Sequence, residues 1–427
     1  MKPFRAHILA IGSELLHGGR VDSNSLFIAD MLAHCGIKVT KKIAVSDDQA
    51  DIQTTLRSSS KQADVVIVTG GLGSTVDDRT REAVATTFGR SLSTHRKAMQ
   101  ILKRQVERRG RVVTPLLVKQ AFMPSGASVL DNLVGTAPGF YVQEGKAHVF
   151  VVPGVPREAR EMMDLQVQPI LERTLKVTAV LWSHAFNTMG LPETDIQQLI
   201  SPFFQATSAI ALSLLASTKG VKVTLSCWRS NKQHSMSSKR TKSFPEGEAL
   251  VLRIREALKP WLFSEGGETM EEVVGQLLSS HQRTLALAES CTGGLVAHRL
   301  TEVPGSSAYL DRGLVTYSNT AKQELLGVSP GLLRKHGAVS VQVAEAMARG
   351  IRAKSHVDLG VSITGIAGPG GGTANKPVGL VYMAIDGPHG CQSQRFQFWG
   401  DRTEIKFRSS QAALNMIRRY LLSSPKG

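Results

Sequence analysis

Short apolar runs that end in glycine-rich turns recur along this chain, and they constrain its fold more than any other feature. Residues 64–69 form one such run and lead into Gly70, and residues 285–287 form another and lead into the turn 288–294. Helical periodicity follows both turns. An apolar run of strand length is typical of a parallel strand that is buried on both faces, and alternation with helices indicates an α/β fold. The sequence therefore predicts α/β domains whose ligands bind at the carboxyl ends of the strands.

The length and the change of pattern along the chain predict three domains. At 427 residues the chain exceeds the usual size of one domain. The strand and helix alternation changes near residue 175, and a new helical pattern begins at residue 268. We therefore expect domains at residues 1–172, 173–262 and 263–427, each α/β in character.

The composition predicts a cytoplasmic protein without metal-binding or bridged cysteines. Hydrophobic residues make up 42% of the chain, yet no apolar run is long enough to cross a bilayer, and the first residues lack the features of a secretion signal. We expect no membrane partner. The four cysteines are scattered singly, so neither disulfides nor a structural zinc site is expected; they are Cys35, Cys227, Cys291 and Cys391.

The formal net charge of +16 favours anionic partners, either nucleic acid or small phosphorylated substrates. Basic residues cluster at 96–111 and at 229–242. The first cluster has helical spacing and is interpreted as the solvated face of a helix. The second has no periodicity and is interpreted as a loop. Small phosphorylated molecules are therefore the expected partners, and nucleic acid is not.

Three predicted strands of the N-terminal part end in glycine-containing turns, which predicts a binding rim on one edge of a sheet. Glycine permits close approach of the backbone to a ligand such as a diphosphate. The candidate ligand-binding residues at this rim are Asn24, Gly70, Gly71, Gly73 and Gly154.

Two adjacent carboxylates, Asp77 and Asp78, follow the turn at residues 70–73. Such a pair can hold a divalent cation, with Glu14 as a further candidate ligand. Alternatively, Asp77 or Asp78 caps the helix that contains Arg81 and Val84. The residue pattern leaves both interpretations open.

Together, the motifs of this half resemble the N-terminal domain of the CinA family of competence/damage-inducible proteins. The motifs are Gly12-Ser13-Glu14-Leu15-Leu16, Gly70-Gly71-Leu72-Gly73 with Asp77-Asp78, Gly135-Thr136-Ala137-Pro138-Gly139-Phe140, and Pro153-Gly154-Val155-Pro156. The resemblance implies a molybdopterin-binding-like three-layer fold. It also implies hydrolysis of ADP-ribose to AMP and ribose 5-phosphate with a divalent metal (Mg, Mn or Co). Ser74 stands where the family usually has proline, which we expect to loosen the turn without removing a ligand.

The same resemblance implies that residues 173–262 form a small α/β connecting domain similar to KH modules. The GXXG loop with which true KH domains bind RNA is not evident in this segment. RNA binding is therefore not expected, in spite of the basic loop.

The turn at residues 288–294 places a hydroxyl, that of Ser290, at the positive end of a helix, where a developing oxyanion is stabilised. A serine needs a base, and no Ser-His-Asp set is present. A lysine kept neutral by desolvation can serve instead, which makes Lys322 the candidate, oriented by Tyr317. The alternative is that Lys322 is an exposed helix lysine. Cys291 is the rival nucleophile, but no histidine pairs with it, and it is interpreted as a packing residue.

Four segments of this part resemble the nicotinamide-nucleotide amidase domain of the same family. They are residues 288–294, residues 315–322, residues 362–369 and Gly400-Asp401-Arg402. The resemblance implies hydrolysis of nicotinamide mononucleotide to nicotinate mononucleotide and ammonia, without a cofactor. It assigns Ser290 as nucleophile, Lys322 as general base, and Tyr317, Thr364 and Arg402 as supporting residues. The candidate substrate-binding residues are Thr292, Gly293, Gly294, Gly365 and Gly368, and we expect Arg402 with the loop 368–372 to bind the substrate phosphate.

These inferences favour a bifunctional enzyme of pyridine-nucleotide salvage. One alternative is that the N-terminal half only binds a pterin or nucleotide. Another is an interaction factor of DNA uptake or recombination. Because two α/β domains are expected to expose sheet edges, a homodimer is also expected.

Overall fold

The computed structural model describes residues 3–177, 179–204, 209–230 and 244–423. Most of the basic segment predicted as a loop at 229–242 lies outside the described residues. The chain forms two compact units, Met1–Trp182 with Cys227–Lys242 and Ser183–Ser226 with Ser243–Gly427. The predicted division into three domains stays a prediction.

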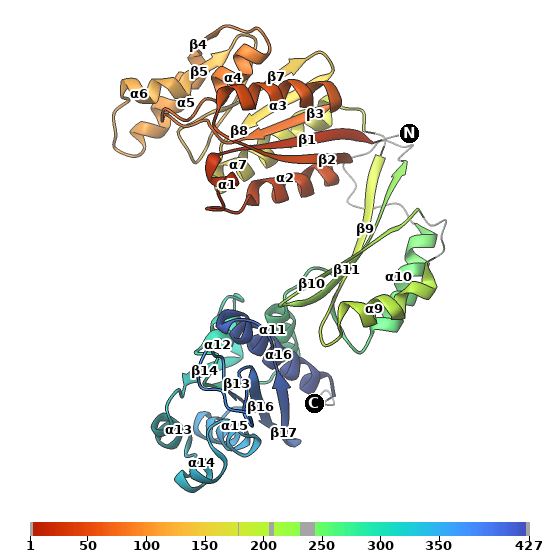
Figure 1. The fold of residues 1–427 in the computed structure, drawn as a ribbon, viewed down its shortest axis with the longest axis vertical. Helices are drawn as coiled ribbons and strands as arrows, with labels where there is room; N and C mark the ends of the chain where they lie inside the picture. Colours follow the sequence, from red (N-terminus) through yellow and green to blue (C-terminus); the bar gives the residue numbers. More distant parts are fainter. Residues whose placement is uncertain (1–2, 178, 205–208, 231–243, 424–427) are drawn as a thin grey trace. The chain divides into compact units, whose positions relative to one another are not determined.

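The N-terminal unit is built on a six-stranded sheet with the order β2-β1-β3-β8-β7-β6 (Figure 1). The first four strands are parallel, and β7 and β6 are antiparallel to their neighbours. A separate pair joins β4 to β5. The strands are β1 (Phe4–Ile11), β2 (Ile37–Val45), β3 (Val65–Thr69), β4 (Leu92–Thr94), β5 (Phe122–Pro124), β6 (Ser128–Leu130), β7 (Gly139–Glu144) and β8 (Ala147–Val152).

Helices cover both faces of this sheet. Alternate residues of a strand point to opposite faces, so each buried strand contributes apolar side chains to both layers of helices. Val65 and Ile67 of β3 pack in the core under α2 and α7, whereas Val66 and Val68 pack under α3 and α4. This arrangement confirms the predicted molybdopterin-binding-like three-layer fold. The helices are α1 (Ser13–Leu16), α2 (Ser23–His34), α3 (Gln49–Gln62), α4 (Thr80–Thr87), α5 (Arg96–Glu107), α6 (Pro115–Val118), α7 (Pro156–Met162) and α8 (Gln168–Thr174).

The middle of the chain forms a four-stranded sheet with the order β10-β11-β9-β12. Its two longest strands, β9 and β11, are neighbours in the sheet. The elements are β9 (Ala179–Thr188), α9 (Glu193–Ile200), β10 (Ala211–Ser217), β11 (Gly220–Ser230), α10 (Pro245–Leu258) and β12 (Leu262–Ser264). The likeness of this segment to KH modules stays a prediction.

The C-terminal part contains a five-stranded sheet with the order β14-β13-β15-β16-β17. Strands β14, β13 and β15 are parallel, and β16 and β17 are antiparallel. The strands are β13 (Leu285–Glu289), β14 (Leu310–Val315), β15 (Leu359–Gly365), β16 (Leu380–Gly387) and β17 (Gly390–Gln397).

Helices also cover both faces of this second sheet, as Figure 1 shows. Leu285 and Leu287 of β13 pack under α11, α12 and α16, and Ala286 and Ala288 pack under α13, α14 and α15. The helices are α11 (Met270–Ser280), α12 (Leu295–Thr301), α13 (Asn319–Leu326), α14 (Pro330–His336), α15 (Val341–Ser355) and α16 (Arg402–Ser423). In the described part of the chain, no helix has both the length and the apolar composition needed to span a bilayer.

Polar side chains cap three helices of the C-terminal part. The Ser318 hydroxyl accepts a hydrogen bond from the Ala321 N–H, and Ser340 does the same for Val343. Asp401 accepts from the Glu404 N–H, and the Glu404 carboxylate accepts from the Asp401 N–H. Reciprocal bonds of this kind fix the first turn of α16.

Gly350 lets α15 approach the end of α13 closely, and α13 carries Lys322. A Cβ added at Gly350 would lie 2.0 Å from the Leu326 carbonyl oxygen, whereas a Cβ at Gly331 in α14 would meet nothing within 4 Å. We predict that Gly350→Ala lowers the free energy of unfolding by about 1–3 kcal/mol because of this overpacking. Gly331→Ala is the matched control, neutral or stabilising by up to about 1 kcal/mol. Urea unfolding of both variants measures the difference, and equal effects would contradict the packing argument.

Candidate active site

The structure brings Ser290 and Lys322 into contact. Ser290 directly follows β13, and Lys322 lies on α13. The Lys322 Nζ lies 3.2 Å from the Ser290 Oγ. Only 8% of Ser290 and 1% of Lys322 is exposed. The two groups therefore meet within proton-transfer distance in a site that is nearly closed to water.

Two backbone carbonyls complete the surroundings of Lys322. Its Nζ lies 2.7 Å from the Thr316 oxygen and 3.4 Å from the Tyr317 oxygen. Burial lowers the pKa of Lys322 below its ordinary value. A neutral amine has two N–H groups for these carbonyls and one lone pair, which is then left for the Ser290 hydroxyl. The interpretation of Lys322 as an exposed helix lysine is wrong.

The glycines of the turn allow the chain to pass from β13 into α12. Gly293 and Gly294 have φ values of 63° and 90°, in the left-handed region that favours glycine. The Glu289 carboxylate accepts hydrogen bonds from the N–H groups of Val296 and Ala297 at the start of α12. This buried acid places negative charge at the positive end of the helix.

Glu289 was not among the site residues predicted from the sequence. The signal was an acidic residue that ends an apolar strand directly before the candidate nucleophile. Since that residue belongs to a strand with buried neighbours on both faces, its carboxylate needed partners inside the domain.

Part of the hydrogen-bonding capacity of the turn is already used. The Ser290 N–H donates to the Ile363 oxygen, and the Gly293 N–H donates to the Ser290 oxygen. Because the Gly293 N–H is engaged, Thr292 is the remaining candidate beside Ser290 for stabilising an oxyanion. Thr292 is fully buried, and its hydroxyl has no hydrogen-bond partner among the described residues.

Tyr317 and Arg402 form a second linked pair beside Lys322. Arg402 donates to the Gly368 oxygen over 2.6 Å and to the Tyr317 hydroxyl over 2.9 Å. The Tyr317 carbonyl is one of the two that accept from Lys322. Tyr317 thus connects the loop that contains Gly368, through Arg402, to the backbone around the lysine.

Thr364 and Gly365 lie near the turn, but in this structure both residues contact other parts of the domain. The Thr364 hydroxyl donates to the Ala338 oxygen over 2.8 Å. In the described part of the chain it has no hydrogen bond to Ser290 or Lys322. A Cβ at Gly365 would lie 2.6 Å from a methyl carbon of Val381, so β15 and β16 pack closely there.

Cys291 is buried in the core beneath α12. Burial raises the pKa of its thiol to about 12. The thiol is therefore protonated at neutral pH and is a weak nucleophile, in keeping with its interpretation as a packing residue.

At the rim of the N-terminal sheet, Asn24 holds two strand ends together. Its amide donates to the Thr69 hydroxyl and to the Gly154 oxygen, each over 2.9 Å. A Cβ at Gly154 would lie 3.2 Å from the Gly70 Cα. The structure thus brings Asn24, Gly70 and Gly154 together, with the Asn24 amide engaged in bonds within the protein.

Asp78 stabilises the glycine-rich loop by hydrogen bonds to other residues of the same loop. Its carboxylate accepts from the N–H groups of Gly73 and Thr75 and from the Thr75 hydroxyl. A Cβ at Gly73 would lie 2.3 Å from that carboxylate. Any larger residue at position 73 would therefore clash with the Asp78 side chain. The N-cap of α4 is Arg79, without a side-chain hydrogen bond to the helix. The alternative that Asp77 or Asp78 caps the helix is therefore wrong.

The predicted metal ligands do not form a ready-made cation site. Gly71 has a φ of 65°, and the loop that follows leaves Asp77 exposed. A hydrogen bond to Thr75 is the main cause that lowers the Asp77 pKa. The Glu14 carboxylate is also exposed and lies over Gly12. Across the residues that the structure describes, no three histidine, cysteine, aspartate or glutamate side chains are grouped to hold a metal ion.

Comparisons with known proteins agree with the two-part architecture. Residues 7–173 match the family model of the probable molybdopterin binding domain, and residues 267–421 match that of the CinA C-terminal domain. A solved structure, the competence/damage inducible protein CihA from Agrobacterium tumefaciens, is 43% identical, covers 36% of this chain and 96% of its own, and superposes with a TM-score of 0.35.

Full-length relatives extend the match along the whole chain. A CinA-like protein of Geotalea uraniireducens (strain Rf4) is 40% identical over 421 residues, 97% of each chain. A putative competence-damage inducible protein of Moorella thermoacetica is 39% identical over 418 residues, 98% of this chain and 99% of its own. This chain belongs to the CinA family.

Proposed function

We propose that the C-terminal domain is an amidase that hydrolyses nicotinamide mononucleotide to nicotinate mononucleotide and ammonia. The observation that carries the proposal is the buried contact between the Ser290 hydroxyl and the Lys322 amine. Burial lowers the pKa of Lys322, so the lysine is available as a base for the serine. The substrate assignment comes from the resemblance of the motifs at residues 288–294 and 400–402 to the nicotinamide-nucleotide amidase domain.

The reaction follows from these two groups. The Ser290 Oγ attacks the carboxamide carbon while its proton moves to the Lys322 Nζ. The tetrahedral intermediate then loses its C–N bond, and the proton passes from Lys322 to the leaving nitrogen, which departs as ammonia. Water attacks the remaining ester on Ser290 and gives its proton to Lys322. That proton returns to the Ser290 oxygen as nicotinate mononucleotide leaves.

Turn and helix supply the electrostatic support for this chemistry. The intermediate carries an oxyanion, and N–H groups at the positive end of α12 stabilise negative charge there. Thr292 is the candidate donor, since the Gly293 N–H is already bonded to the Ser290 carbonyl. Tyr317 and Arg402 hold the backbone beside Lys322, which is consistent with supporting roles.

The nucleophile can be distinguished from its neighbour by two substitutions. We predict that Ser290→Ala lowers the rate of ammonia release by at least about a thousandfold, because it removes the attacking oxygen. Cys291→Ala should keep most of the activity, because the thiol is buried and protonated. Steady-state ammonia release with both purified variants is the measurement. Loss of activity in Cys291→Ala with retention in Ser290→Ala would reverse the assignment.

For the N-terminal domain we propose hydrolysis of ADP-ribose to AMP and ribose 5-phosphate with a divalent ion. The glycine-rich strand ends around Gly70 and Gly154 suit the approach of a diphosphate. The carboxylates as arranged do not fit a preformed metal site, so no catalytic step is assigned to a metal. A binding-only role for a pterin or nucleotide is the second candidate, favoured by the use of Asp78 in the loop itself. A homodimer and a cytoplasmic location stay predictions.

Metal dependence separates the two candidates for this domain. We predict AMP release when the full chain is mixed with ADP-ribose and Mg²⁺, Mn²⁺ or Co²⁺, and no release after addition of a chelator. Product analysis by mass spectrometry is the measurement. If ADP-ribose binds but no AMP forms with any of the three ions, the result would contradict hydrolysis and support the binding-only role.

A further inference from the structure

Lys406 places a second cation beside the nucleophile turn. It lies on α16, is half-buried, and belongs to none of the motifs singled out above. A Cβ added at Gly293 would lie 3.5 Å from the Lys406 Nζ. The ammonium group is therefore next to the turn that carries Ser290, on the side of α16.

Within the part of the chain that the structure describes, no carboxylate forms an ion pair with this ammonium group. The residues one turn away on the same helix are Arg402, Thr403, Ser409 and Ser410, none of them acidic. The nearby acid, Glu404, bonds instead to the N–H of Asp401. Of the ion pairs formed among the described residues, none includes Lys406. Because Lys406 is only half-buried, its ammonium group is accessible to an anion from solution.

The helix that carries Lys406 is fixed against α12. Arg299 of α12 donates to the Ser410 hydroxyl over 2.8 Å and to the Gln411 side-chain oxygen over 2.6 Å. Its guanidinium carbon also lies 4.8 Å from the centre of the Phe407 ring. Because Phe407 is adjacent to Lys406, these contacts set where the lysine side chain leaves the helix.

Arg402, which also lies on α16, already donates hydrogen bonds to other residues of the domain. Its guanidinium donates to the Gly368 oxygen and to the Tyr317 hydroxyl. Those bonds hold two loops together, whereas the Lys406 ammonium has all three donors available for a ligand. The two residues thus differ in role although both are basic.

We propose that Lys406 binds the phosphate of the nucleotide substrate and so makes the site select phosphorylated nicotinamide compounds over their nucleosides. The proposal rests on the amidase function proposed above and moves the phosphate contact predicted for Arg402 to Lys406. A lysine serves here as a point charge for a phosphate oxygen. The phosphate is remote from the amide, so its binding energy is used mainly to hold the substrate.

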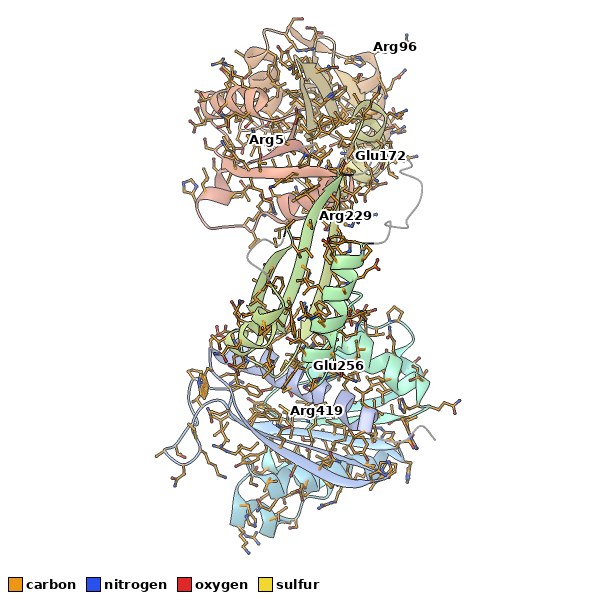
Figure 2. All side chains as sticks on the ribbon, turned by 90° about the vertical axis from the view of Figure 1, so that its right-hand side faces the viewer. Arg5, Arg96, Glu172, Arg229, Glu256 and Arg419 are labelled. Carbon is orange, nitrogen blue, oxygen red and sulfur yellow. The ribbon has the colours of Figure 1, made fainter. Side chains whose placement is uncertain are left out.

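The test compares two substrates that differ only in the phosphate. Ammonia release is measured with nicotinamide mononucleotide and with nicotinamide riboside, for the unchanged full chain and for Lys406→Met, Lys406→Arg and Arg419→Met. Met keeps the aliphatic stem of the lysine, and Arg keeps its charge. Arg419 is exposed, is labelled in Figure 2, and lies about 20 Å further along α16, so it controls for loss of net charge.

We expect Lys406→Met to lower kcat/KM for the mononucleotide about 10- to 100-fold, chiefly through KM, with the riboside unaffected. Lys406→Arg and Arg419→Met should keep the preference for the mononucleotide. Equal losses on both substrates, or no loss on either, would overturn the role of Lys406 while leaving the amidase intact. No ammonia from either substrate with the unchanged chain would overturn the amidase function, and this inference with it.

Discussion

The exclusion of water from one amine is the constraint on which the C-terminal domain depends. In water, the ammonium form of a lysine is strongly favoured at neutral pH, and it has no lone pair for a serine proton. At Lys322 burial opposes the charged form, and two carbonyls occupy the N–H groups of the neutral form. Loss of one proton from the amine leaves a lone pair for the Ser290 hydroxyl, whose oxygen lies 3.2 Å from the Lys322 Nζ. If water entered this site, Lys322 would become protonated and could not act as a base, although every residue of the site would still be present.

The fold keeps that pocket dry through close packing at the ends of parallel strands. Ser290 follows β13, an interior strand of the sheet, and the chain after β14 brings the two carbonyls and then α13. Gly350 permits α15 to pack against the end of α13. Glu289, just before the nucleophile, fastens the start of α12. Both residues of the candidate catalytic pair thus lie on or beside elements whose positions are set by packing and by backbone hydrogen bonds.

The sequence predicted the layers, because apolar strands that alternate with helical periodicity leave local signals. The roles of Ser290 and Lys322 were implied by the resemblance of their motifs, whereas the residue pattern alone left Lys322 open as an exposed helix lysine. Other features arise only from contacts in space. Asp78 has the sequence signature of a cap or a ligand, yet it bonds back to Gly73 and Thr75. In the sequence, Glu289 resembles any acidic residue at the end of a strand. Its hydrogen bonds to the first turn of α12 are visible only in the folded domain. Lys406 is one of many lysines, and its lack of a partner is visible only once α16 packs against α12.

The pH dependence of kcat/KM for ammonia release from nicotinamide mononucleotide tests the central claim most directly, since it reports the ionisation of the free enzyme. Lys322 must lose its proton to act, so activity should rise with pH. Because burial lowers its pKa, the midpoint should fall below the ordinary lysine value of 10.5. A midpoint at or above 10.5, or a rate that does not change with pH, would contradict the account of Lys322 as the base.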